Sequence, residues 1–289
     1  MEIRQLAISL HDGGNIVIQT QESEELVAFS GFKELLGIKS DFPLVDAADV
    51  ELVTRQNLPQ PRHTLKRTEF LESAYSADWS RVFVAGASGH DPHKNYYQCR
   101  LWQAALICGA MNQLFRGGNA LLAHGAALET EQGAVLLFGE SGMGKSTAAT
   151  RWRASGGKCI SDDMVLLDFS GESVFVRRMP TWSACRESRN LWNYPSEEEL
   201  PLHGVLALGR SENGIDEIVP LSEAQFFAQI YRSMFYWNLS FIRTLPEERQ
   251  QKLANIIRER AQEIAKNFPP RALLSALDGD LLQFLREKL

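Results

Sequence analysis

The sequence has few cysteines and no long uninterrupted apolar run. Its 289 residues include four cysteines, none in C-x-x-C spacing, which predicts reduced thiols rather than a disulfide scaffold, and a cytoplasmic location. The most apolar stretch, residues 101–115, is interrupted by Gln103, Asn112 and Gln113 and is too short to span a bilayer. This pattern predicts a buried helix and no membrane partner.

Positive charge is also scarce. The 30 lysines and arginines are outnumbered by 36 acidic residues, and the formal net charge of -6 argues against a nucleic-acid partner held by overall phosphate attraction. The N-terminal residues MEIRQLAISL lack the basic and apolar regions of a signal peptide. No internal repeat or low-complexity tract is present. With 44% hydrophobic residues, the chain is typical of a soluble globular protein of one large domain or two small ones.

Residues 1–95 predict a β-rich N-terminal module. A β-hairpin is expected around the Asp-Gly step of the segment HDGGN. Residues 56–67 contain two prolines and many polar side chains, which predicts a loop. The other expected elements are strands at 2–9, 15–20, 49–55 and 79–85 and a short helix at 23–36.

Residues 96–289 predict an α/β core that begins with a long helix. Residues 181–201 are aromatic and of mixed charge without a clear period, which predicts an exposed functional loop or a partly helical excursion. The expected helices are 95–115, 147–154, 222–236, 247–266 and 279–289. The expected strands are 120–129, 133–138, 158–161, 164–168, 173–178 and 205–208.

A glycine-rich loop stands at the centre of this core. Gly139, Gly144, Lys145 and Ser146 satisfy the pattern G-x-x-x-x-G-K-[ST], with an apolar run before it and a helix-forming run after it. A strand, a glycine loop and a helix in this order are the context that a phosphate-binding loop requires. The pattern therefore predicts an anion site, and most simply one for ATP.

The chemistry of phosphate binding explains these residue types. Gly139, Gly142 and Gly144 permit positive φ angles, so that successive N–H groups converge at one point, which the positive end of the following helix also faces. Lys145 would reach the β- and γ-phosphates, and the Ser146 hydroxyl would hold Mg²⁺. The expected nucleotide-binding residues are Gly139, Glu140, Ser141, Gly142, Met143, Gly144, Lys145, Ser146 and Thr147.

Residues of about 95–220 resemble the HPr kinase/phosphorylase family and its HPr-kinase-related relatives. The resemblance rests on His124-Gly125 in a strand, the G-E-S-G-M-G-K-S loop, and a later strand that ends in Asp162-Asp163. It implies a P-loop kinase core of the HPr kinase and phosphoenolpyruvate carboxykinase type, here preceded by the β-rich module. It also implies transfer of phosphate from ATP, with Mg²⁺, to a hydroxyl, usually of serine, on a protein, peptide or small molecule.

The resemblance also implies roles for individual residues. Asp162 is expected to act as the base and Asp163 as a metal ligand with Ser146, although the two aspartates could be exchanged, and Asp168 is a rival for the metal. His124 would lie beside the phosphate site, or else be a core histidine. An arginine cluster after the aspartates would clamp the substrate, or else be a solvated basic face. Its members are Arg177, Arg178, Arg186 and Arg189.

Two departures from the family change the expected acceptor. The typical N-terminal module of HPr kinase/phosphorylase and the glycine-rich basic signature after its core are not found in the sequence, so HPr as acceptor, phosphorolysis and a hexamer do not carry over from the family and stay open. HPr-kinase-related proteins of peptide-modifying pathways resemble the chain better, and their acceptors include precursor peptides and free serine. A homo-oligomer remains open. The alternatives are a nucleotide-binding scaffold without kinase activity and a general P-loop ATPase, the latter disfavoured by the lack of an LSGGQ-like signature.

Overall fold

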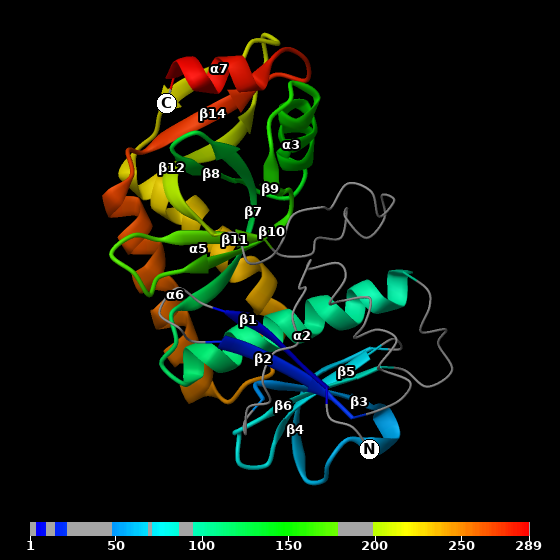
Figure 1. Ribbon diagram of the computed structural model, residues 1–289. Coiled ribbons are helices and arrows are strands. Elements are labelled where there is room, and N and C mark those ends of the chain that lie inside the picture. Colours follow the sequence, from blue (N-terminus) through cyan, green and yellow to red (C-terminus); the bar gives the residue numbers. More distant parts are fainter. Residues whose placement is uncertain are drawn as a thin grey trace. The chain divides into compact units, whose positions relative to one another are not determined.

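The computed structural model describes residues 4–9, 15–21, 48–68, 71–86, 95–178 and 199–288. The fold is mixed α/β with two sheets, one in each of two compact units (Figure 1). The first unit comprises Met1–Ala120, Pro180–Glu198 and Asn238–Leu253, and the second comprises Leu121–Met179, Glu199–Trp237 and Ala254–Leu289. Among the described residues, no helix has the length and apolarity needed to cross a membrane.

The first unit is built on a six-stranded sheet in the order β1-β2-β3-β6-β5-β4. Its central pairs β2–β3 and β3–β6 are parallel, and the other pairs are antiparallel. Helix α2 packs on the sheet, and the 3-10 helix η1 follows β3. The elements are β1 (Arg4–Ser9), β2 (Asn15–Thr20), β3 (Val50–Thr54), η1 (Arg55–Asn57), β4 (Arg62–Arg67), β5 (Leu71–Ser76), β6 (Val82–Gly86) and α2 (Asn95–Phe115).

A buried carboxylate fixes the end of α2 to this sheet. The Asp49 side chain is 1% exposed and accepts hydrogen bonds from the Val17 N–H at 2.9 Å, the Asn112 amide at 3.0 Å and the Gln113 amide at 3.0 Å. The Arg116 guanidinium lies 3.1 Å from the same carboxylate. Two of the polar residues that interrupt the apolar run of α2, Asn112 and Gln113, therefore satisfy one buried charge.

In this unit the predicted N-terminal hairpin is confirmed, and the loop predicted at residues 56–67 is wrong. β1 and β2 pair antiparallel, with Arg4 opposite Thr20 and Ser9 opposite Asn15. The segment 56–67 is not all loop, because β4 forms there, and β5 was not expected. β4 is a polar edge strand in which only Leu65 is buried, so the sequence offers almost no apolar alternation. The predicted helix at 23–36 lies outside the described residues.

The sheet of the second unit follows the order β11-β10-β7-β8-β12-β14-β13, with β9 also pairing with β7. β8, β12 and β14 are parallel to one another, and the start of β12 also pairs with β11, which closes this part of the sheet on itself. The strands are β7 (Ala120–Thr130), β8 (Gly133–Phe138), β9 (Cys159–Ser161), β10 (Met164–Asp168), β11 (Phe175–Arg178), β12 (Glu199–Arg210), β13 (Glu217–Pro220) and β14 (Arg271–Ser275).

Helices α3 and α7 cover one face of this sheet. Trp152 of α3 and Leu281 of α7 are fully buried in one cluster with Val135, Leu137 and other apolar side chains of the strands. Each such side chain contributes about 1.5–3 kcal/mol when fully buried, which fixes α3 behind the loop that precedes it. The remaining helices are α3 (Lys145–Ala154), α5 (Glu223–Ile242), α6 (Glu247–Asn267) and α7 (Leu281–Lys288).

The elements expected from 95 to 178 form as predicted, including the antiparallel β10–β11 hairpin. The predicted C-terminal helices form as α5, α6 and α7, and the strand expected at 205–208 is part of the longer β12. β13 and β14 were not expected, and residues 181–198 lie outside the described part of the chain. The division expected at residue 95 remains a prediction.

Candidate functional site

The glycine loop joins the end of β8 to the start of α3. Gly142 and Gly144 have φ angles of 83° and 98°, in the left-handed region where a Cβ atom is disfavoured. Gly139 was expected to share this conformation, and that expectation is wrong. A Cβ at Gly139 would instead lie 3.2 Å from the Leu208 carbonyl oxygen, so this glycine permits a close approach to β12.

Lys145 is turned into the loop. Its side chain is buried, and its ammonium group donates hydrogen bonds to the carbonyl oxygens of Gly139 at 2.8 Å and Glu140 at 3.0 Å. Burial lowers the pKa of Lys145, and the nearby negative charge of Asp163 opposes that shift. The ammonium group is thus held at the point where the loop curls, and an anion bound there would offer it stronger, charge-assisted hydrogen bonds.

His124 and Asp163 form a pair beside this loop. The His124 Nε2 atom lies 3.1 Å from Asp163 Oδ1, and the His124 ring stacks on Tyr236 with ring centroids 4.3 Å apart. The turn that carries Asp163 is fixed to β7, because the Gly125 N–H donates to the Asp163 carbonyl at 3.0 Å. The imidazole is nearly buried, whereas the Asp163 side chain is 24% exposed and can be reached by a second molecule.

The adjacent aspartate, Asp162, faces a different group. Its Oδ2 atom lies 3.7 Å from the Arg153 guanidinium, and its side chain is 5% exposed. Asp168 is fully buried and accepts hydrogen bonds from both the N–H and the hydroxyl of Ser170 in the β10–β11 turn. Of the three candidate aspartates, Asp163 is the one paired with His124, whereas Asp168 ends β10 and its carboxylate holds the turn that follows.

The residues present fit a magnesium–nucleotide complex. Mg²⁺ commonly takes only one or two protein ligands and completes its shell with phosphate oxygens and water. Ser146 and Thr147, in the first turn of α3, are exposed and accessible to a metal–phosphate group. The residues that the structure describes contain no group of three or more His, Cys, Asp or Glu side chains placed to hold a metal ion by themselves.

The predicted arginine clamp is not assembled among the described residues. Arg177 is 5% exposed, in β11, and its guanidinium is paired with the Glu199 carboxylate. The clamp role expected for Arg177 is at odds with this position, because an acceptor would have to displace a buried ion pair. Arg178 ends β11, its side chain is outside the description, and Arg186 and Arg189 lie outside the described residues.

Two other arginines lie against the loop. Arg210, at the end of β12, donates from Nη2 to the Gly142 carbonyl at 2.7 Å. Arg232, in α5, places Nη1 2.9 Å from Glu140 Oε1. The sequence did not predict a role for either arginine, because neither lies near a motif. β12 and α5 are far from the glycine loop in the sequence and come next to it only in the folded chain. The parallel pairing of β12 with β8 is the signal that would have identified Arg210.

The fold and the site define a mixed α/β protein with a glycine loop, a helix that starts at its lysine, and a histidine–aspartate pair beside it. The family model described as "SynChlorMet cassette protein ScmC" matches residues 94–287, and the chain belongs to this family.

The comparisons with curated proteins and with solved structures give weaker evidence than the family model does. None of the curated proteins matches the chain significantly. Among solved structures, the HPr(Ser) kinase/phosphatase from Coxiella burnetii aligns with 12% sequence identity over 50% of this chain and 97% of that chain, with a TM-score of 0.25. A TM-score this low does not establish a common fold.

Proposed function

We propose that the protein is a kinase that uses ATP and Mg²⁺ to phosphorylate a hydroxyl, most simply that of serine. The observation that carries the proposal is the His124–Asp163 pair, 3.1 Å apart, with the charge of Asp163 acting on the loop lysine. Phosphoryl transfer requires a phosphate cradle and, beside it, a group that orients the incoming hydroxyl and accepts its proton. An anion-binding loop alone requires no such pair.

We assign the base to Asp163 rather than to Asp162. The acceptor hydroxyl would donate its proton to the Asp163 carboxylate, and its oxygen would form a bond to the γ-phosphorus while the bond to the β–γ bridging oxygen breaks. The His124 imidazole would hold the Asp163 carboxylate in position. Lys145 and the loop N–H groups would bind the phosphate oxygens. Asp162 would have a structural role, in which its ion pair with Arg153 stabilises the turn after β9.

Mg²⁺, when bound, would neutralise charge on the phosphate oxygens, and the Ser146 hydroxyl would hold it. The loop between β8 and α3, with parallel β12 alongside, supports a core of the HPr kinase and phosphoenolpyruvate carboxykinase type. The family name describes its members as cassette proteins. We therefore propose that the acceptor is a peptide, protein or small molecule handled by the same cassette.

The first experiment separates nucleotide binding from transfer. Calorimetry of the whole chain with ATP and Mg²⁺ should detect one site, and Lys145→Ala should weaken that binding at least about tenfold because it removes a charge-assisted contact to phosphate. Radiolabelled γ-phosphate should then be transferred to an acceptor. Tight binding with no transfer to any product of the cassette would favour the alternative, a nucleotide-binding partner without kinase activity.

A further inference from the structure

A small cavity lies on the histidine side of the glycine loop. Its volume is about 230 Å³, which is less than the roughly 300–1,000 Å³ of pockets that hold a whole drug-sized ligand. It is therefore large enough for a group the size of one amino acid, but not for a nucleotide. The lining residues, which define the α5 cavity, are His124, Gly139, Glu140, Ser141, Gln229, Arg232, Ser233 and Tyr236.

One polar face of α5 forms half of this cavity. Residues 229, 232, 233 and 236 are spaced by three and four, so their side chains share one side of the helix. Phe226, Ile230 and Met234 are fully buried and anchor another side of the helix in the core. α5 thus presents an amide, a guanidinium, a hydroxyl and a phenol to the cavity from a fixed support.

The charged group of this face has an exchangeable partner. Arg232 and Glu140 are 2.9 Å apart, but their side chains are 68% and 69% exposed. An ion pair this exposed contributes little to stability, and a carboxylate from another molecule can replace Glu140 on the planar guanidinium. The Tyr236 ring, which stacks on His124 and is 50% exposed, lines the cavity together with Arg232 and His124.

We infer that the α5 cavity is the acceptor subsite, and that it selects acceptors that carry a carboxylate within one residue's length of the reacting hydroxyl. The inference rests on the proposed kinase function. The acceptor carboxylate would bind Arg232 in place of Glu140, while the hydroxyl would lie at Asp163 beside His124. A free hydroxy amino acid and a serine at the C-terminus of a peptide share this chemistry, and the experiment below distinguishes them.

The test compares matched acceptors that differ only in the carboxylate. N-acetyl-L-serine and N-acetyl-L-serinamide are offered with ATP and Mg²⁺, together with one hexapeptide that ends in serine as the free acid or as the amide. The acids should be preferred at least about tenfold in kcat/KM, the range of a bidentate charged contact. Preference confined to the first pair would identify a small acceptor, and preference confined to the second a peptide.

Two variants with opposite expected effects test whether Arg232 binds the acceptor or has only a structural role. Arg232→Met should raise KM for the acid and bring the acid-to-amide ratio in kcat/KM near one. Glu140→Gln should instead lower KM for the acid about two- to fivefold, because a competing carboxylate is removed. Arg258→Met, which removes an exposed arginine of α6, should leave the ratio unchanged. Circular dichroism confirms that each variant is folded.

A second readout separates this inference from the kinase proposal. Binding of the same acid and amide is followed by saturation-transfer NMR in the presence of a non-hydrolysable ATP analogue. Binding that prefers the acid and requires Arg232, without transfer in any assay, would retain the subsite and overturn the kinase proposal. Transfer with no preference for acids, or a preference that survives Arg232→Met, would overturn the subsite and retain the kinase. Equal binding of acid and amide, or binding of neither, would also overturn the subsite.

Discussion

A buried ion pair behind the glycine loop should determine much of the stability of the second unit. Arg151 of α3 and Asp216 are 8% and 9% exposed in their side chains, and two guanidinium nitrogens contact the two carboxylate oxygens, with Nη1 at 3.0 Å from Oδ1. Arg151 also donates to the carbonyl oxygens of Ala276 at 2.9 Å and Gly279 at 3.2 Å. The guanidinium therefore joins the loop helix to the turn between β14 and α7.

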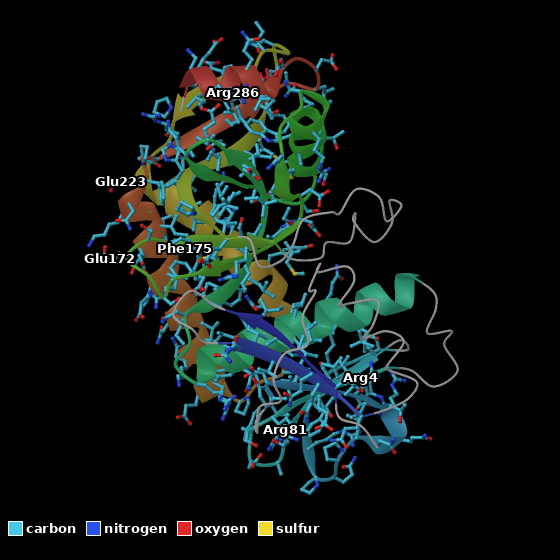
Figure 2. All side chains as sticks on the ribbon, viewed as in Figure 1. Arg4, Arg81, Glu172, Phe175, Glu223 and Arg286 are labelled. Atoms are coloured by element: carbon cyan, nitrogen blue, oxygen red, sulfur yellow. The ribbon has the colours of Figure 1, made fainter. Side chains whose placement is uncertain are left out.

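We expect Arg151→Met to lower the free energy of unfolding by about 3–5 kcal/mol, because the Asp216 carboxylate would lose its charged partner and the buried Ala276 carbonyl would lose its donor. The assay is urea unfolding followed by circular dichroism. Arg286→Met is the control, since Arg286 lies on the surface of α7 (Figure 2), 3.7 Å from Glu131, and both side chains are mostly exposed. That pair should contribute less than about 1 kcal/mol. Similar losses in the two variants would refute the reasoning.

The same pair gives a pH dependence. Burial alone would raise the pKa of Asp216, but hydrogen bonds from Arg151 and from the Ala276 N–H outweigh it and lower the pKa. The stability that the charged carboxylate contributes is thus present above its unfolded pKa, about 3.9, and is lost as the pH falls toward the lower folded value. The difference in stability between wild type and Asp216→Asn should accordingly shrink below about pH 4. A difference that grows with acid would contradict this account.

Three further predictions follow from other buried groups. Burial raises the pKa of Cys108 and of Cys159 to about 12, so peptide mapping after iodoacetamide treatment at pH 8 should show both thiols alkylated at least about 10³-fold more slowly than in urea. Because burial lowers the pKa of Lys145, its charge costs stability until the pH rises through the folded pKa toward 10.5. The stability of the wild type relative to Lys145→Met, measured by thermal melts, should therefore rise as the pH approaches 10.5, and the variant should lose stabilisation by ATP at pH 7. Asp49→Ala should destabilise the first unit by about 3 kcal/mol in urea, since several buried donors would lose their acceptor; a loss below about 1 kcal/mol would be inconsistent with the network.

The parts of the fold that could be predicted carry a strong local signal. The run 133–154 contains a buried strand, a glycine loop and a helix start, and these form within a residue or two of the expected limits. β13 and β14 gave a weaker signal because they pair with each other across about 50 residues of chain, and β14 also pairs with the distant β12. β4 pairs with the adjacent β5, but it is a polar edge strand. β4 buries only Leu65, and the pattern of β13 shows no fully buried residue.

The site follows the same rule. The loop lysine and the two aspartates were identified from spacing, but the direction of each carboxylate depends on how the turn after β9 is held by Gly125 of β7. Because neighbouring side chains of an extended segment alternate, the sequence predicts that Asp162 and Asp163 point in different directions. It does not predict which of the two contacts His124. Arg232 and Tyr236 could not be predicted at all, because a helical period identifies a face of α5 without identifying what that face meets.

The central claim, phosphoryl transfer with Asp163 as the base, is tested most directly by single-turnover transfer of γ-phosphate from ATP to the acceptor. Asp163→Asn should slow the transfer about 10²- to 10⁴-fold while ATP binding is retained. Asp162→Asn, the neighbouring control, should slow it far less. Equal transfer rates for wild type and Asp163→Asn, or a larger loss in Asp162→Asn, would contradict the account.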